Sequence, residues 1–338
     1  MPSVSTPLLL LILIIMFGVI FDFINGFHDT ANAIATSVAT RVLSPGQAVA
    51  MSAVFNFVGA LSGTAVATTV GKGIIAPANS TQLVVIAALV SAITWDLVTW
   101  YFGIPSSSSH ALIFSIVGAG VAAAGFDAIE TGGLSKTFQG LVFSPLFGFA
   151  VGFAVMIGLF WIFARVRPRV VNSIFGKAQI LSAAYMSYSH GLGDAQKTMG
   201  IITMALASYY GWSGGEWHVP IWVIATAATA MSLGTAVGGW RVINTMGFKV
   251  VELRPINGFA AETAAASIIE IAARLGIPTS TTHVISSAIL GVGSTRRVSA
   301  VRWGIAGRIL AAWVITIPAC IAMGWGIYEA LSLVTGGH

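Results

Sequence analysis

The sequence has very little charge: only 8% of its 338 residues are Asp, Glu, Lys or Arg, whereas 56% are hydrophobic. A soluble domain carries about 25% charged residues, so water could not solvate the surface of this chain. The composition excludes a soluble enzyme, a disordered protein and a disulfide scaffold. Cysteine is nearly absent too: Cys320 is the single one, and no disulfide within the chain is possible. We therefore expect an integral membrane protein in which each of the few charges needs a specific explanation.

Apolar segments of the length needed to cross a bilayer, about 20 residues, recur along the whole chain. The first covers about 6–26 and is interpreted as a spanning helix, because no basic residue precedes it and no small-residue cleavage site follows it. The pattern predicts an all-α fold with about 10 to 12 membrane segments. Segments 106–125 and 280–294 follow Gly-Ile-Pro breaks and are expected to be broken or re-entrant helices.

The charges of the short loops predict the orientation, since basic residues favour the cytoplasmic side. Basic clusters occur in three loops, at 164–179, 241–254 and 296–302. Acidic residues of the alternate loops are Asp127, Glu130 and Glu216. We therefore expect 164–179 to be cytoplasmic and both termini to be extracellular or periplasmic.

Two motifs occur twice, in the same order. Gly103-Ile-Pro-Ser-Ser-Ser-Ser-His110 recurs 173 positions later as Gly276-Ile-Pro-Thr-Ser-Thr-Thr-His283. Asn25-Gly-Phe-His-Asp29 recurs 165 positions later as His190-Gly-Leu-Gly-Asp194. Inverted repeats with broken helices are typical of secondary transporters. We expect a first inverted repeat at 1–163, a basic cytoplasmic linker at 164–179 and a second inverted repeat at 180–338.

Asp29 and Asp194 occupy the same point of one repeated motif, although a charge at the bilayer centre costs about 2.5–3.5 kcal/mol. We expect Gly26 and Gly191 to break their helices and to free carbonyl groups for a cation. Two asparagines would add oxygen ligands, Asn25 and Asn32. This chemistry suits Na⁺ or a protonatable carboxylate and does not suit zinc.

The hydroxyl-rich runs at 106–109 and 279–282 predict a site for an anion, in contrast to the cation site of the first motif. Their prolines suit the first turn of a helix, so both runs would begin half-helices. Free N–H groups and helix dipoles attract an anion there, and hydroxyls suit an oxyanion that also carries O–H. Capping or close packing would explain one such run more simply. Two runs in register favour anion binding.

Other polar residues also fall in the expected spans. Structural pairing or a place near the interface accounts for three acids, Asp22, Asp96 and Glu270. For Glu262 a structural and a functional role are both open. Lys197 follows Asp194 by three residues, so we expect it to pair with Asp194, to contact an anion, or both. His110 and His283 are interpreted as hydrogen-bonding residues beside the site.

Together these motifs resemble the inorganic phosphate transporter (PiT) family. The resemblance covers nearly the whole chain in the family's order, at 23–33, 103–110, 190–200, 241–247, 258–262 and 276–283. It implies a secondary symporter of inorganic phosphate built from two inverted repeats, and a homodimer in the bilayer. No cofactor is expected besides the co-transported H⁺ or Na⁺, and no nucleic-acid partner.

The family's functional residues fall on matching positions of this chain. Its signature Asp and Asn fall on Asp29 and Asn32, its second Asp on Asp194, and a further acid on Glu262. The phosphate-contacting positions fall on Ser107, Ser108, Ser109, Ser280, Thr281 and Thr282. We add Asn32 and Lys197 to the phosphate site. The coupling group, which would bind the co-transported ion or proton, comprises Asp29, Asp194 and Glu262. To it we add Asn25, His28 and His190.

Four positions depart from the family's pattern. His28 and Gly193 stand where the family has Asn before each signature Asp, Lys197 replaces a later Asn, and Asn56 replaces a carboxylate of sodium-coupled members. Each change removes a sodium ligand or adds a titratable or cationic group, and imidazoles titrate near pH 6.5. Similar substitutions occur in bacterial members that resemble proton-coupled transporters. We therefore expect H⁺ in preference to Na⁺.

Three alternatives remain. The first is a permease of the same fold for sulfate or another tetrahedral oxyanion; sulfate carries no O–H at neutral pH, so a buried carboxylate facing the anion would select against it. An intramembrane enzyme is disfavoured, because a catalytic centre rarely needs duplicated inverted copies. A passive channel would show flux without a gradient of H⁺ or Na⁺. A metal-phosphate complex is open as the transported species.

Overall fold

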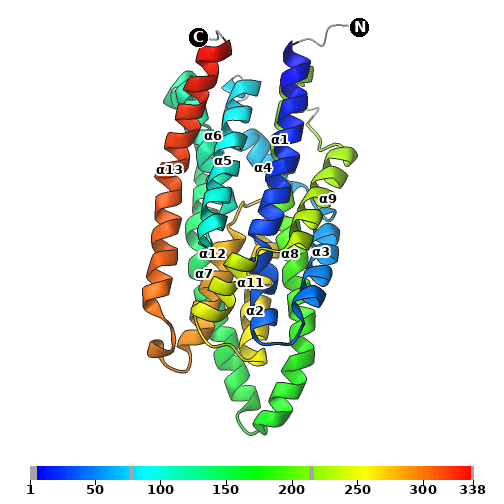
Figure 1. Ribbon diagram of the computed structural model, residues 1–338, viewed down its shortest axis with the longest axis vertical. Helices are drawn as coiled ribbons and strands as arrows, with labels where there is room; N and C mark the ends of the chain where they lie inside the picture. Colours follow the sequence, from blue (N-terminus) through cyan, green and yellow to red (C-terminus); the bar gives the residue numbers. More distant parts are fainter. Residues whose placement is uncertain (1–5, 77–78, 213–216, 336–338) are drawn as a thin grey trace.

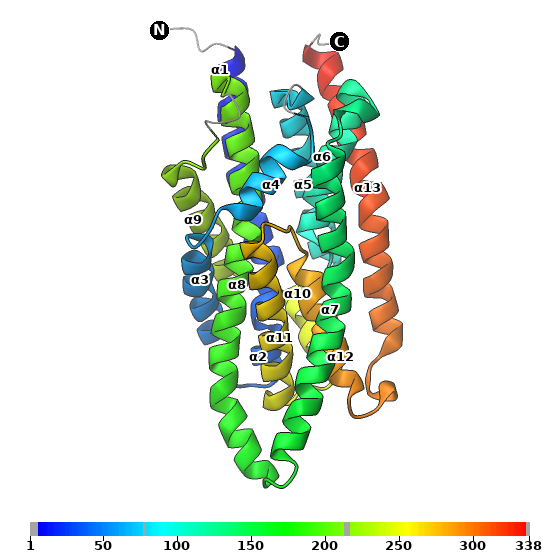
Figure 2. The same ribbon diagram turned by 180° about the vertical axis from the view of Figure 1, so that it is seen from behind.

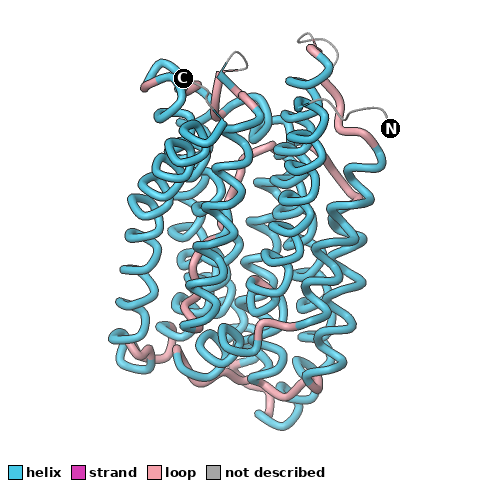
Figure 3. The backbone as a smooth tube through the Cα atoms, turned by 45° about the horizontal axis from the view of Figure 1, so that its top comes forward, coloured by secondary structure: helices cyan, strands magenta, loops and turns pink. Residues whose placement is uncertain are grey.

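The structure is a computed structural model that describes residues 6–76, 79–212 and 217–335. Within these ranges the secondary structure is helical, with no strand and one isolated backbone bridge between Ile75 and Ile129 (Figure 3). The predicted all-α fold is confirmed. Glu216 and both chain ends lie outside the described residues.

Both halves of the chain contain long and short helices in the same order. The first half holds α1 (Thr6–His28), α2 (Thr30–Ala39), α3 (Pro45–Ala60), α4 (Ala65–Gly73), α5 (Gln82–Phe102), α6 (Ser108–Ala124), the 3₁₀ turn η2 (Phe126–Ala128) and α7 (Thr131–Phe163). The second half holds α8 (Pro168–Tyr210), α9 (Ile221–Val237), α10 (Trp240–Asn244), the π-helical turn η3 (Thr245–Lys249), α11 (Pro255–Arg274), α12 (Thr281–Ser294), the 3₁₀ turn η4 (Val298–Ala300) and α13 (Trp303–Thr335).

The connection between the halves is shorter than the sequence predicted. Only 164–167 join α7 to α8, because Pro168 occupies the first helical position of α8. Most of the predicted linker, residues 168–179, therefore forms the first turns of α8.

The two halves run in opposite directions along the long axis. α1 descends from the end marked N, whereas α8 rises from the turn at the opposite end (Figures 1 and 2). α7 and α13 are likewise opposed. The start of α1 and the end of α13 lie at one end of the molecule, and the α7–α8 turn lies at the other.

Packing between the halves occurs in matched pairs. α1 packs on α9, and the corresponding pair with the halves exchanged is α8 and α3. Likewise, α6 packs on α13, and the corresponding pair is α12 and α7. Glycines allow these close approaches: a Cβ on Gly118 would lie 2.1 Å from the carbonyl oxygen of Ile321, and one on Gly291 would lie 2.2 Å from that of Phe149. Gly118 and Gly291 are 173 positions apart, as the two Gly-Ile-Pro motifs are, and they make equivalent contacts in the two halves.

By length and apolarity, four segments of the described chain can cross a bilayer: Pro7–Ala39, Gln82–Phe102, Thr131–Phe163 and Trp303–Val334. Two bent helix pairs raise the number to as many as six, with a 69° bend between α3 and α4 and a 60° bend between α9 and the α10–η3 segment. The sequence predicted about 10 to 12 membrane segments. The higher number includes the short α6 and α12 and the more polar α8 and α11, and none of these four helices meets the criteria of length and apolarity. Broken helices are present, as predicted.

Candidate functional site

α5 and α11 end just before the two copies of the Gly-Ile-Pro segment. Gly103 and Gly276 each adopt a φ of +64°, a left-handed conformation that favours glycine. We predicted the two prolines in the first turns of α6 and α12, but both helices begin three residues after the proline. Ser107 and Ser280 cap them, because each hydroxyl accepts a hydrogen bond at 3.2 Å from the backbone N–H three residues on.

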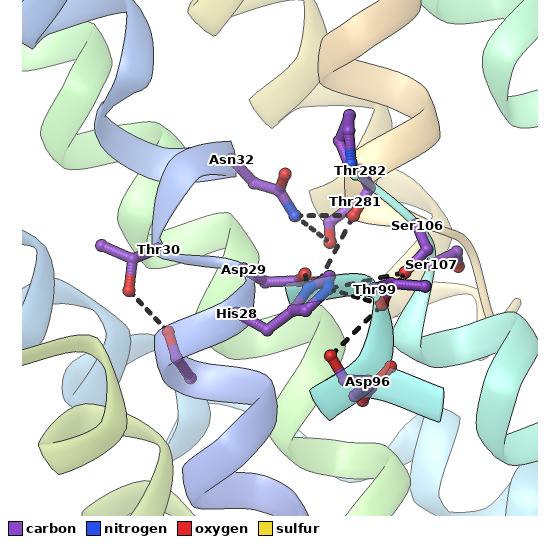
Figure 4. Close-up of polar contacts among 12 residues, drawn as sticks. His28, Asp29, Thr30, Asn32, Asp96, Thr99, Ser106, Ser107, Thr281 and Thr282 are labelled. Atoms are coloured by element: carbon purple, nitrogen blue, oxygen red, sulfur yellow. Dashed lines mark hydrogen bonds and ion pairs between the residues drawn. The ribbon is translucent and has the colours of Figure 1, made fainter. Parts of the chain in front are cut away.

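The N-terminal ends of α6 and α12 meet the α1–α2 junction and the middle of α8. The Asn32 amide donates hydrogen bonds to the hydroxyls of Thr281 at 3.2 Å and Thr282 at 2.9 Å (Figure 4). The Thr281 hydroxyl donates to Asp194 at 3.1 Å, and the Thr282 hydroxyl donates to Asp29 at 3.4 Å. Residues predicted from three separate parts of the chain therefore form one buried group. With Ser109 and Lys197, we call it the central cluster.

Lys197 gives the central cluster a positive charge. Its ammonium group donates to Asp194, one turn earlier on α8, and to the hydroxyl of Ser109 on α6. Ser109 in turn donates to the backbone carbonyl of Thr279 at 3.1 Å. The predicted pairing of Lys197 with Asp194 is confirmed. Through Ser109, the lysine also joins α8 to the starts of both half-helices.

Asp29 is linked to the break before α6. Oδ1 of Asp29 lies 2.6 Å from Nδ1 of His28, and Nε2 of His28 lies 3.2 Å from the hydroxyl of Thr99 (Figure 4). Ser106 donates to Thr99 at 2.7 Å. The sequence prediction missed Thr99, because a single threonine in an apolar helix carries no motif.

Asp29, Asp194 and His190 lie close enough to share a cation. Their ligand atoms are all within 4.8 Å of one another, and Nε2 of His190 lies 3.6 Å from Oδ2 of Asp194. The side-chain oxygens of Asn25 and Asn32 are buried and have no hydrogen-bond partner in the described part of the chain. Such an oxygen-rich set fits a hard cation or a proton better than zinc.

The predicted glycine breaks are wrong. α8 runs unbroken through Gly191, and α1 continues past Gly26 to His28, so only Asp29 interrupts the helix. A Cβ on Gly26 would lie 2.3 Å from the carbonyl oxygen of Met231, and one on Gly191 would lie 2.1 Å from that of Asn56. Both glycines therefore permit close helix packing, and side chains supply the candidate cation ligands.

Glu262 lies in a second buried group, which meets α2 at Thr36, four residues or about 6 Å along the helix from Asn32 of the central cluster. It accepts hydrogen bonds from the hydroxyls of Thr36 and Ser182 and, at 3.1 Å, from the amide of Gln179. Ser182 and Asp194 are twelve residues apart on α8, about 18 Å along the helix axis. We call Glu262 and its three donors, Thr36, Gln179 and Ser182, the Glu262 group. The sequence identified Glu262 but none of its three uncharged donors.

Two histidines brace the half-helices. The rings of His110 and His283 are 4.4 Å apart between centroids, and His283 stacks on Trp313 at 3.8 Å. Trp313 donates to the backbone carbonyl of Pro105 at 3.1 Å. This stack fixes the starts of α6 and α12 relative to each other.

The central cluster combines hydroxyls, an ammonium group and two helix N-termini with two carboxylates. None of its members is more than 2% exposed. The Ser108 hydroxyl is also buried near the Asp96 carboxyl, and it meets the geometry of a hydrogen bond with none of the described residues. The arrangement can hold an oxyanion and a cation side by side in a site closed to solvent.

Comparison with known proteins gives concordant matches. A profile of the Phosphate transporter family matches residues 25–324. A protein of Rhizobium meliloti (strain 1021) described as "Probable low-affinity inorganic phosphate transporter" is 52% identical over 326 residues, covering 96% of this chain and 97% of that protein. One of Bacillus subtilis (strain 168) with the same description is 48% identical over 329 residues, covering 97% and 98%.

A solved structure supports the fold. The structure named "The sodium-dependent phosphate transporter" superposes with a TM-score of 0.89 at 24% identity, over 96% of this chain and 100% of that one. The family match and the full-length relatives show that the chain belongs to the Phosphate transporter family, a family of membrane transporters and not of enzymes.

Proposed function

We propose that this protein imports inorganic phosphate together with a coupled cation across the cell membrane by alternating access. The observation that carries the proposal is the meeting of the N-termini of α6 and α12 with Asp29, Asp194 and Lys197 in one buried cluster. Helix N-termini and hydroxyls attract the oxyanion, and a carboxylate accepts a hydrogen bond from the O–H of hydrogen phosphate. The names of the relatives support phosphate as the substrate.

A phosphate anion is too costly to carry through hydrocarbon alone, so a cation or proton binds with it. Asp29 and Asp194 hold that cation, with Asn25 and Asn32 as further oxygen ligands. His28 and His190 contact these carboxylates and serve proton transfer.

The coupled cation is H⁺ in this proposal, with Na⁺ as the alternative. Lys197 already bonds to Asp194 and supplies a fixed positive charge. Asn56, which replaces a carboxylate of sodium-coupled members, lies 3.0 Å from His190 and offers a neutral ligand. The name of the structural neighbour supports Na⁺ for that protein.

Inverted repeats at 1–163 and 180–338 supply the two access routes in this mechanism. The opposed directions of α1 and α8 and the matched packing pairs support this division. We place the α7–α8 turn in the cytoplasm and the termini outside, because the basic loops lie near that turn. A homodimer, and a metal-phosphate complex as the transported species, remain predictions from the resemblance.

Uptake of radiolabelled phosphate into proteoliposomes tests the proposal, with a pH gradient or a sodium gradient imposed one at a time. Asp29→Asn and Asp194→Asn should each abolish uptake, whereas Asp127→Asn in the exposed η2 turn should preserve it. Normal uptake in the first two variants would overturn the proposal. Equal competition by sulfate would favour the oxyanion permease, and flux without either gradient would favour a channel.

A further inference from the structure

A groove of about 530 Å³ lies between α5 and α13, outside the central cluster. Most of its wall is apolar, including Val98, Phe102, Ile305, Ile309 and Ile315. Two basic residues also line it, Lys249 and Arg308, and no acidic residue does. The groove is therefore amphipathic, with a cationic part and an apolar part.

Arg308 lies within a spanning helix, yet its side chain is exposed. It follows Trp303, the first residue of α13, by five positions, or about 7.5 Å along the axis. Trp303 is 45% exposed, as is typical of aromatic residues at the membrane interface. In the described part of the chain, no group makes a hydrogen bond or ion pair with the Arg308 guanidinium. A long cationic side chain at this depth reaches the lipid headgroups.

The inner wall of the groove is shared with the transport site. Thr99, Gly103 and Pro105 line the groove. The Thr99 hydroxyl also lies 3.2 Å from His28, and Pro105 precedes the half-helix α6. An occupant of the groove would therefore pack directly against the break that positions the serines of α6.

We propose that this groove binds an anionic phospholipid, with the headgroup phosphate on Arg308 and Lys249 and an acyl chain along the apolar wall. Charge complementarity supports this occupant, because basic pockets between membrane helices hold anionic headgroups. The bound lipid holds the 103–105 break in place and so supports transport. The effect on transport rests on the proposed phosphate uptake, whereas the binding of lipid does not.

Native mass spectrometry of the full-length protein tests the binding, with phosphatidylglycerol and phosphatidylcholine as probes. The test variant is Lys249→Gln/Arg308→Gln. The matched control, Arg296→Gln/Arg297→Gln, removes two exposed arginines from the loop before α13. The wild type should retain phosphatidylglycerol preferentially, the test variant should bind it roughly 10-fold more weakly, and the control should match the wild type. Ala311→Trp, in the groove wall, should also weaken binding with both cations intact.

The lipid site is refuted if the wild type shows no preference for phosphatidylglycerol, or if the arginine control loses as much binding as the test variant. Phosphate uptake is then measured in phosphatidylcholine vesicles with and without phosphatidylglycerol. Phosphatidylglycerol should stimulate uptake by the wild type and the control, but not by the test variant. If the test variant had a higher KM for phosphate than the wild type in pure phosphatidylcholine, the groove would instead be a route for phosphate. Loss of a wild-type dimer in the test variant would make it a protein interface, and either result overturns the proposal. Preferential lipid binding in a protein without uptake would support the site and count only against the proposed function.

Discussion

Lys197 donates a hydrogen bond to Asp194 from one turn further along α8, and each residue is 1% exposed. Asp194 also accepts a hydrogen bond from Thr281, at the start of the half-helix α12. The charges of the pair balance each other, and the Lys197 ammonium group lies at the point where the oxyanion would bind. Removing either partner leaves an uncompensated buried charge.

Lys197→Met should destabilise the protein by about 3–5 kcal/mol, the cost of breaking a buried ion pair from one side. Thermal unfolding in detergent, monitored by size-exclusion chromatography of the heated protein, measures this loss of stability. Lys197→Met/Asp194→Asn should recover most of the stability, because no unpaired charge remains, but should not recover uptake. If Lys197→Met alone unfolded at the wild-type temperature, the pair would not be the charge balance of the cluster.

The sequence predicted the residues of the central cluster better than it predicted their backbone. Asp29, Asp194 and the threonines of α12 were predicted because each lies in a repeated motif, and Asn32 because it offers an oxygen ligand beside Asp29. The structure brings all of them together. The helix breaks were predicted at the wrong glycines. A glycine that lets two helices touch and a glycine that bends a helix look identical in a sequence, since both positions lack a Cβ.

Gly26→Ala and Gly191→Ala should each destabilise the protein, because the added methyl group would lie 2.3 Å and 2.1 Å, respectively, from a backbone carbonyl oxygen of the neighbouring helix. Alanine alone would favour a helix by about 1 kcal/mol over glycine, so the sign of the effect is diagnostic. Thermal unfolding in detergent measures it.

Gly158→Ala in α7 is the matched control, because a Cβ there meets nothing within 4 Å. It should be neutral or stabilising. Stability equal to that of this control in both Gly26→Ala and Gly191→Ala would support flexible helix breaks and contradict the packing role.

The Glu262 group shows where sequence reasoning ends. Thr36, Gln179 and Ser182 are uncharged and belong to no repeated motif. Thr36 lies on α2, and the other two lie three residues apart on α8. Their shared acceptor is visible only after α2, α8 and α11 have packed together. Arg308 was missed for another reason: a lone arginine near the end of an apolar segment gives no indication of what it faces.

Glu262→Gln should separate phosphate binding from transport. Among the described residues, no side-chain hydrogen bond joins the Glu262 group to the central cluster, so phosphate should still raise the thermal unfolding temperature of this variant. Uptake should fall about 10-fold or more, since Glu262, a predicted member of the coupling group, has lost the carboxyl that could exchange a proton. Asp29→Asn should lose both responses. Loss of phosphate-dependent stabilisation in Glu262→Gln would place Glu262 in the substrate site.

Neighbouring serines at the start of α6 should have different roles. The Ser107 hydroxyl caps the helix, so Ser107→Ala should cost about 1 kcal/mol of stability. The Ser108 hydroxyl is buried without a partner among the described residues, so Ser108→Ala should leave stability unchanged. A lost hydrogen bond to a charged ligand is worth about 1.5–3 kcal/mol, so Ser108→Ala should raise the KM for phosphate at least about 10-fold. Thermal unfolding and concentration-dependent uptake measure the two quantities in both variants. An unchanged KM in Ser108→Ala would remove Ser108 from the phosphate site and leave its buried hydroxyl without a function.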